Sequence, residues 1–372
     1  MASGFTLDVT RLMTRFNRRT PNGIDRVDFA YAQRFLGEVG SVAAGVIWTP
    51  LGAARVGGAP MRIALDALGR HWRELPLPAR ATLSMARANV HLNVSQFPIW
   101  TSAYARWVVR QPGKPVYFLH DTLPLSHPEY FPAAELARHR ARLANIAATA
   151  RGVIVASETV ANSLRDHCRT LMRPAPPICV APLGLAPAFI QTPTAPAPPA
   201  DRYFVVLGTL EPRKNHRLLL DVWRAMIRKD PARTPKLAIV GKRGWENGST
   251  FAMLDQSPEL RPYVREERAM DTPSLCALLD GTLGALMPSF AEGYGLPVHE
   301  ALARGAPVIA SNIPAFRSIS SPLLTLIDPT DGLAWLDAVE SLTAAPRVPR
   351  GARRAPTWDD HFATVEAFLA GF

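Results

Sequence analysis

The sequence predicts an α/β protein with two doubly wound domains, each built on a parallel sheet. Its 372 residues leave room for two domains, and 48% hydrophobic with 20% charged residues is an ordinary globular composition. Short apolar runs alternate with amphipathic helical patterns, which favours parallel sheets covered by helices. A proline-rich, uncharged stretch at residues 191–200 divides this alternation and predicts a semi-extended linker.

Residues 1–190 are assigned to the first domain. Apolar runs bounded by turn residues predict strands at 5–9, 42–48, 90–94, 116–119, 153–156 and from 178. Helical periodicity predicts helices at about 25–36, 132–150 and 158–168. The cysteines lack the spacing of a zinc site or a disulfide framework, so we expect them to be reduced and buried. They are Cys168, Cys179 and Cys276.

Residues 201–355 are assigned to the second domain, which repeats the same alternation. Strands are expected at 203–207, 236–240, 283–287, 307–310 and 324–327. One helix is expected to begin after Asn215, which is a candidate N-cap, and another is expected between Pro297 and Gly305. Further helices are expected at about 274–279 and 333–342. A last amphipathic helix is expected at 358–370, within a terminal segment, 356–372, that we treat separately.

The stretch at residues 288–312 predicts a ligand site. A strand, a glycine-containing loop, a helix and a second strand place the loop at the carboxyl edge of a parallel sheet, where a helix amino end favours an anion. Seven residues separate Glu292, in the loop, from Glu300, which we expect in the first helical turn. Both carboxylates are expected to face one pocket. Taken singly, either one would be explained by solvation or by the helix dipole.

A second loop, residues 208–215, predicts a phosphate site. It begins at Gly208 after a strand and carries Arg213 and Lys214 just before a helix amino end. Two cations beside free N–H groups suit a diphosphate, the arginine through its planar fork and the lysine as a point charge. Exposed loop charges are the alternative explanation.

Two positions in the first domain also lie at strand ends. His120 and Asp121 follow the 116–119 strand, where they form either a structural pair or part of a site. No Gly-x-Ser-x-Gly elbow accompanies them, so a hydrolase triad is not predicted. Gly23 lies in the first strand-to-helix loop, where phosphates meet backbone N–H groups, although most Asn-Gly pairs are only turns.

The net charge of +11 favours an anionic partner. Arginines crowd the first helix and its approach: Arg11, Arg15, Arg18, Arg19, Arg26 and Arg34. An anionic membrane surface or a phosphorylated substrate would fit, and a solvated basic face is the alternative. A nucleic-acid partner is not expected, because no reading module is found. No signal-peptide pattern and no run of about 18 apolar residues is found, so we expect a cytoplasmic protein, peripheral to the membrane at most.

These motifs resemble those of the family-4 retaining glycosyltransferases. Glu292 and Glu300 match the Glu-x7-Glu signature, and Gly-Thr-Leu-Glu-Pro-Arg-Lys-Asn from Gly208 is close to the family pattern. Gly241-Lys-Arg-Gly-Trp is similar to the family's segment near the nucleotide base. The resemblance is strongest at residues 203–314. It implies a GT-B fold with the acceptor held by 1–190, the nucleotide sugar by 200–355, and the terminal helix crossing back to the first domain.

The resemblance also implies roles for the site residues. Arg213, Lys214 and the helix amino end at Gly295 and Leu296 would stabilise the departing nucleoside diphosphate. No Asp-x-Asp motif is present, so no metal and no other cofactor is expected. Glu300 would bind the ribose hydroxyls. Glu292 would bind the donor sugar and its oxocarbenium-like centre, and His120 the same sugar, with retention through same-face attack.

Two similarities suggest the donor and the acceptor. Gly23-Ile-Asp-Arg and His120-Asp-Thr-Leu-Pro resemble mannosyltransferase-like members, which implies GDP-mannose and a glycan or lipid-linked saccharide, with a UDP-sugar as the alternative donor. The Glu292/Glu300 spacing disfavours an inverting transferase or an epimerase. An inactive homologue is disfavoured because the expected polar residues are present. Residues 316–319 depart from the family's acidic turn, so no contact from that turn is carried over.

Overall fold

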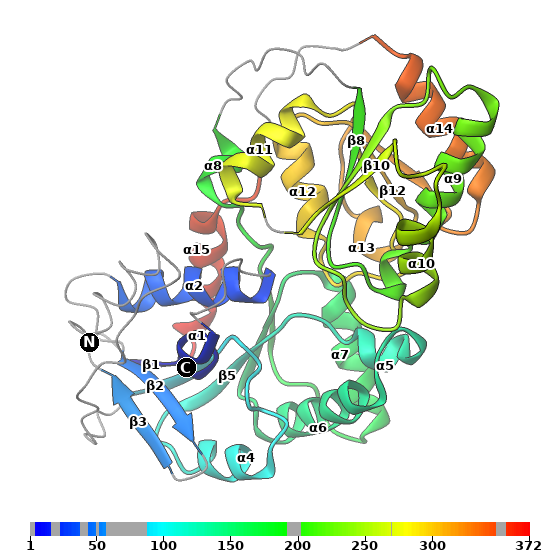
Figure 1. The fold of residues 1–372 in the computed structure, drawn as a ribbon. Coiled ribbons are helices and arrows are strands. Elements are labelled where there is room, and N and C mark those ends of the chain that lie inside the picture. Colours follow the sequence, from blue (N-terminus) through cyan, green and yellow to red (C-terminus); the bar gives the residue numbers. More distant parts are fainter. Residues whose placement is uncertain are drawn as a thin grey trace. The chain divides into compact units, whose positions relative to one another are not determined.

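The computed structural model describes residues 4–15, 23–37, 44–49, 52–56, 88–191, 202–268, 270–346 and 355–372. The chain divides into two compact units (Figure 1). Unit 1 comprises Met1–Ser126, Ala133–Leu183 and Trp358–Phe372, and unit 2 comprises His127–Pro132 and Gly184–Thr357. We assigned residues 184–190 to the first domain, but they pack in unit 2. Residues 192–200 of the expected linker lie outside the described residues.

Unit 1 contains a seven-stranded sheet in the order β3-β2-β1-β4-β5-β6-β7. The strands are β1 (Phe5–Asp8), β2 (Ala44–Thr49), β3 (Gly52–Val56), β4 (Val90–Asn93), β5 (Lys114–Leu119), β6 (Gly152–Val155) and β7 (Ile178–Val180). Neighbouring strands are parallel except at the edge, where β3 is antiparallel to β2. The sequence prediction missed β3, whose run Gly-Ala-Ala-Arg-Val has little of the β-branched and aromatic character of a strand.

Helices cover both faces of this sheet. They are α1 (Thr10–Arg15), α2 (Gly23–Leu36), α4 (Ser102–Val108), α5 (Leu123–Ser126), α6 (Ala133–Thr149), α7 (Glu158–Thr170) and α15 (Trp358–Leu369). Tyr117 and Leu119 of β5 face a core shared with α4, α6 and α7. The intervening Phe118 instead meets Tyr31 of α2 at a ring distance of 6.0 Å. The two-residue period of β5 therefore places a core on each side.

The terminal helix α15 is a structural part of unit 1. His361 shares a 2.8 Å hydrogen bond with the Tyr31 hydroxyl and lies 3.0 Å from the Pro182 carbonyl oxygen. Glu366 pairs with Arg34 at 2.6 Å. These contacts join α15 to α2 and to the segment after β7.

Unit 2 contains a six-stranded parallel sheet in the order β10-β9-β8-β11-β12-β13. The strands are β8 (Tyr203–Leu207), β9 (Lys236–Val240), β10 (Val264–Glu267), β11 (Ala285–Met287), β12 (Val308–Ser311) and β13 (Leu324–Ile327). The sequence prediction missed β10, because three of its four residues are charged. An edge strand tolerates such residues, since one side of it remains open to water.

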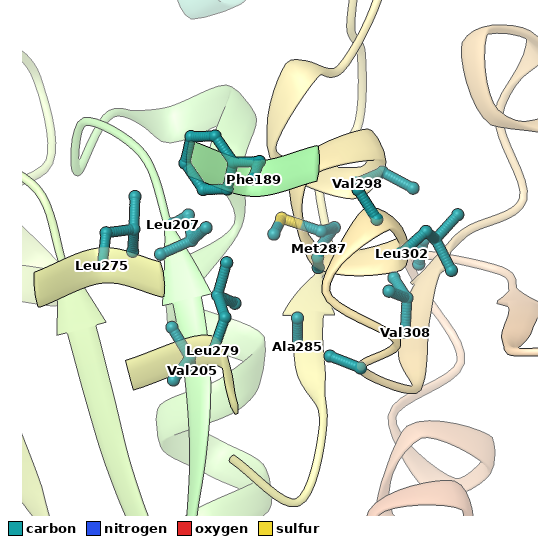
Figure 2. Close-up of a cluster of buried hydrophobic side chains, with 14 of the residues drawn as sticks. Phe189, Val205, Leu207, Leu275, Leu279, Ala285, Met287, Val298, Leu302 and Val308 are labelled. Atoms are coloured by element: carbon teal, nitrogen blue, oxygen red, sulfur yellow. The ribbon is translucent and has the colours of Figure 1, made fainter. Parts of the chain in front are cut away.

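Side-chain alternation also divides the core of unit 2. Val205 and Leu207 face α8 (Pro187–Ile190), α11 (Thr272–Gly281) and α12 (Leu296–Ala303), as Figure 2 shows. Phe204 and Val206 face α9 (His216–Lys229), α10 (Gly248–Gln256) and α14 (Gly332–Ala344). The short helix α13 (Pro314–Arg317) and the 3-10 turns η1 (Pro128–Tyr130) and η2 (Pro212–Lys214) complete the unit.

Helix α12 is held at both ends of its buried face. Val298 and Leu302 lie against Met287 and Val308 in the core (Figure 2). After the helix, Arg304 forms a buried ion pair with Asp280 of α11, and its Nη1 donates to the Ala188 carbonyl oxygen at 3.0 Å. The helix amino end is therefore fixed relative to the sheet.

Candidate functional site

Three loops of unit 2 meet at the carboxyl edge of its sheet. They follow β8 (residues 208–215), β9 (241–247) and β11 (288–295), and parallel strands put their carboxyl ends at one edge. Backbone hydrogen bonds tie the loops together. The Leu210 N–H donates to the Lys242 carbonyl at 2.9 Å, and the Phe290 N–H donates to the Arg213 carbonyl at 2.8 Å. Motifs about 80 residues apart in the sequence therefore lie side by side.

Glu292 lies at the centre of an ion-pair cluster in these loops. Its carboxylate accepts from Arg213 Nη1 at 2.8 Å, from Lys214 Nζ at 2.5 Å and from the Ser289 hydroxyl at 2.8 Å. The Glu292 side chain is 8% exposed. Both cations predicted to clamp a diphosphate are thus already in contact with the first glutamate of the predicted signature.

A second carboxylate, Glu211, completes the cluster and was missed by the sequence analysis. Its Oε1 lies 2.7 Å from Arg213 Nε, and its side chain is 4% exposed. Glu211 lies inside the Gly-Thr-Leu-Glu-Pro-Arg-Lys motif, which was the one available signal. The formal charges of the two carboxylates cancel those of Arg213 and Lys214.

The electrostatic environment keeps Glu292 ionised. Burial alone would raise its pKa, but Arg213 and Lys214 outweigh that effect and hold the pKa at about 2. Glu211 differs, because burial dominates and raises its pKa despite Arg213. A bound diphosphate would share the N–H groups of Lys214 and Arg213 with Glu292, since an ammonium has three donors and a guanidinium five.

Two of the predicted glycines are required by close backbone approach. A Cβ on Gly241 would lie 1.9 Å from the Gly208 carbonyl oxygen, so the first two loops can approach this closely here only because residue 241 is a glycine. Gly295 is the N-cap of α12 with φ of 83°, and a Cβ on it would lie 2.3 Å from Phe316 Cε1. Phe316 belongs to the stretch that departs from the family pattern, and it packs directly against this N-cap.

Two expectations about helix starts need correction. Helix α12 begins at Leu296, so Glu300 lies in its second turn rather than its first, and Glu300 is 5% exposed. Asn215 precedes α9, but its side chain makes no capping bond to that helix. Its backbone is left-handed, with φ of 53°, and its amide donates instead to the Pro329 carbonyl at 3.0 Å.

In unit 1, His120 follows β5 as predicted. Its Nε2 lies 2.9 Å from the Val94 carbonyl oxygen, so this nitrogen donates and Nδ1 remains an acceptor. Burial lowers the pKa of His120 to about 4, so its imidazole is neutral at pH 7. The sequence analysis missed the support behind it, where His139 donates to the Asp121 carbonyl at 3.0 Å.

The remaining predictions concern Gly23, the arginines near the first helix, metal and membrane binding, and the cysteines. Gly23 begins α2 and is exposed, while the residues before it, 16–22, lie outside the described part. Of the six crowded arginines, Arg11 pairs with Asp25 at 2.7 Å and Arg34 with Glu366 at 2.6 Å.

Among the described residues, no group of acidic, histidine or cysteine side chains could hold a metal ion, and no helix is long and apolar enough to cross a membrane. All three cysteines are buried, and none of them forms a disulfide.

Residues 201–345 match the family model for glycosyl transferases group 1. This segment contains all three loops of the unit 2 site. Over the whole chain, the structure resembles that of Anabaena HepE in complex with UDP and glucose, with a TM-score of 0.68, 15% identity and complete coverage of both chains. It also resembles WaaG, a glycosyltransferase involved in lipopolysaccharide biosynthesis, with a TM-score of 0.59, 14% identity and coverage of 92% and 90%. The fold is GT-B.

Curated relatives match over shorter stretches. Escherichia coli O-antigen chain mannosyltransferase B is 31% identical over 129 residues, covering 35% of this chain and 33% of that protein. The E. coli serotype-specific mannosyltransferase WbdA is 27% identical over 218 residues, covering 55% of this chain and 26% of that protein. The matched stretch is therefore about a third or less of these relatives' own length.

Proposed function

We propose that this protein is a glycosyltransferase that transfers a hexose from a nucleotide sugar to a glycan or lipid-linked saccharide in cell-surface polysaccharide synthesis. The observation that carries the proposal is the Arg213, Lys214 and Glu292 cluster, buried in the segment that matches the group 1 family. Glycosyl transfer releases a nucleoside diphosphate, and such a cluster provides fixed cations where that charge develops.

Each site residue has a chemical task in this proposal. Lys214 and Arg213 bind the diphosphate, and the N–H groups at the amino end of α12 add to the positive potential. Glu292 orients both cations and contacts the donor sugar. Glu300 binds the ribose hydroxyls from α12. Gly208, Gly241 and Gly295 allow the three loops to approach one another and the donor.

The finer assignment is retention of configuration by a family-4 enzyme with GDP-mannose as donor. The O-antigen mannosyltransferase relatives support mannose. A UDP-sugar is the second candidate, supported by the complete-length structural likeness to a protein solved with UDP and glucose. Neutral His120 would accept a hydrogen bond from a sugar hydroxyl at its Nδ1.

Donor binding is the direct test. Purified protein with GDP-mannose or UDP-glucose should show a raised melting temperature and slow release of nucleoside diphosphate, and the preferred nucleotide identifies the donor class. Because no metal is proposed to take part, binding should be equal in EDTA and in magnesium. Loss of binding on chelation would refute the metal-free site. Indifference to every nucleoside diphosphate would refute the proposed function.

A further inference from the structure

A short segment, residues 127–132, packs in unit 2 although the chain on both sides of it belongs to unit 1. It contains the 3-10 turn η1 (Pro128–Tyr130) and the aromatic residues Tyr130 and Phe131. The sequence analysis makes no prediction for residues 127–131. Its contacts involve two of the three loops that form the site.

Tyr130 contacts the loop that carries Glu292. Its ring stacks on Phe290 with centroids 5.5 Å apart and planes at 6°. His127 stacks on Tyr130 at 6.2 Å and 16°. Phe290 is two residues before Glu292, and its N–H donates to the Arg213 carbonyl at 2.8 Å. A ring stack on Phe290 therefore restrains the backbone that sets both members of the Glu292–Arg213 pair.

The same segment contacts the loop after β9. The indole N–H of Trp245 donates to the Tyr130 carbonyl at 3.0 Å, and Phe131 packs against Trp245 at a ring distance of 6.2 Å. The neighbouring Gly244 N–H donates to the Leu210 carbonyl at 3.0 Å, which links this loop to the one that carries Glu211. Residues 127–132 thus hold the 241–247 and 288–295 loops on either side of the 208–215 loop.

We propose that Tyr130 is a positioning residue for the transfer reaction, holding Phe290 and through it Glu292 in contact with Arg213 and Lys214. This inference rests on the proposed function, because its kinetic consequence exists only if the cluster is the donor site. Stacked aromatic pairs contribute enough that loss of one such contact should reduce turnover about three- to tenfold.

The test compares Tyr130→Ala, Tyr130→Phe and a matched control, Tyr263→Phe with Tyr263→Ala. Tyr263 is another partly buried tyrosine of unit 2, and its hydroxyl donates to the Pro231 carbonyl at 3.0 Å. Tyr130→Ala should lower kcat/KM by about three- to tenfold, and Tyr130→Phe should restore it, because the ring makes the contact. Neither Tyr263 variant should change it. An equal loss in Tyr130→Phe, or no loss in Tyr130→Ala, would overturn the proposal.

Two further measurements separate positioning from general destabilisation. In a double-mutant cycle, Tyr130→Ala should have little additional effect on kcat in a Glu292→Gln background, since both changes act through one carboxylate. Full additivity would refute the coupling. Hydrogen exchange of peptides covering 288–292 in the ligand-free protein should be faster in Tyr130→Ala only, and unchanged exchange would also count against the proposal. The exchange measurement needs no donor. If the wild type turns over no nucleotide sugar, the proposed function fails while the loop contact is still tested.

Discussion

The carboxyl edges of the two sheets satisfy their buried polar groups in different ways. In unit 2, Glu292 and Glu211 are balanced by the charges of Arg213 and Lys214. In unit 1, Asp8 at the end of β1 accepts from the Thr10 N–H at 2.9 Å and from Asn93 Nδ2 at 3.2 Å, which are both neutral donors. The unit 2 edge pairs its buried carboxylates with cations, whereas the unit 1 edge gives Asp8 uncharged hydrogen-bond donors.

This difference indicates which edge is suited to an anion. Cations that contact carboxylates can exchange part of those contacts for contacts with a diphosphate. The cations are already removed from water in the folded protein, so binding adds little further desolvation cost for them. The Asp8 network extends instead to Tyr104, whose hydroxyl receives a hydrogen bond from Asn93 Nδ2 at 2.9 Å and lies 3.0 Å from His91 Nε2. The side chains of this network form hydrogen bonds with one another, which suits a structural role.

The largest expected effect comes from removing one cation of the charged edge. Lys214→Met leaves buried Glu292 with Arg213 as its remaining cation and should cost on the order of 3 kcal/mol of unfolding free energy. Nucleotide-sugar turnover should fall about a hundredfold or more, because a leaving-group contact is lost. Denaturant unfolding and steady-state kinetics measure the two effects. Lys229→Met is the control, since its ion pair with Glu340 is exposed and should contribute less than about 1 kcal/mol. Similar losses in both variants would show that the buried and the exposed ion pair contribute equally.

The two signature glutamates should give the next largest effects, and different ones. Glu292→Gln should mainly lower kcat, because the charge on the sugar and the leaving group changes during transfer. Glu300→Gln should mainly raise KM, because nucleotide contacts are the same in the ground and transition states. Each change should be about ten- to a hundredfold. Full kcat in folded Glu292→Gln would show that the cluster is not the active site.

At the uncharged edge, Asp8 should make stability depend on pH. Burial raises the pKa of Asp8 to about 6, so the native state holds a proton that the unfolded chain releases near the ordinary aspartate pKa of 3.8. Its contribution to stability is therefore full below pH 4 and is lost as pH rises to about 6, by on the order of 3 kcal/mol. Asp8→Asn should remove this loss. The difference in unfolding free energy between the two proteins, followed from pH 4 to pH 7, should change in favour of the variant. A constant difference would show that Asp8 is ionised in the fold without penalty.

The smallest effect is expected at a membrane surface. We propose that arginines between Arg11 and Arg34 attract anionic lipid, with about 1 kcal/mol for each charge near the surface. Arg11 and Arg34 contribute less than the sequence suggested, because each is paired with a carboxylate. Sedimentation with anionic vesicles at low salt should exceed that with neutral vesicles and decline as salt is raised. Equal sedimentation with both lipids would contradict the proposal.

The local sequence is sufficient to locate a strand where most of its residues are apolar and buried on both faces of the sheet. The predicted bounds of β8 and β9 match the structure, because β8 is a continuous buried apolar run and β9 has such a run after Lys236. β10 was missed because an edge strand can be charged, and only pairing with β9 reveals it. The GT-B fold was predicted through the resemblance of several motifs, and the structural neighbours confirm it.

The sequence predicted which loops of the candidate site lie together, but not the side-chain contacts within it. Gly208, Arg213, Lys214 and Glu292 lie in motifs that follow strands, and Glu300 is indicated by its seven-residue spacing from Glu292. Glu211 was missed because no spacing rule says that a carboxylate two residues before an arginine will turn back onto it. The stack of Tyr130 on Phe290 joins residues 160 positions apart, and that contact exists only once the chain has folded.

Helix α15 makes the order of synthesis matter for folding. Unit 1 includes Trp358–Phe372, so it is interrupted by the whole of Gly184–Thr357. While unit 2 is being translated, Tyr31 still lacks His361, and α2 has an uncovered aromatic surface. Unit 2 is complete earlier in synthesis, because its separate segment, His127–Pro132, is translated before the rest of the unit. Unit 2 can therefore complete its fold on the ribosome first, while unit 1 remains exposed to chaperones until α15 emerges.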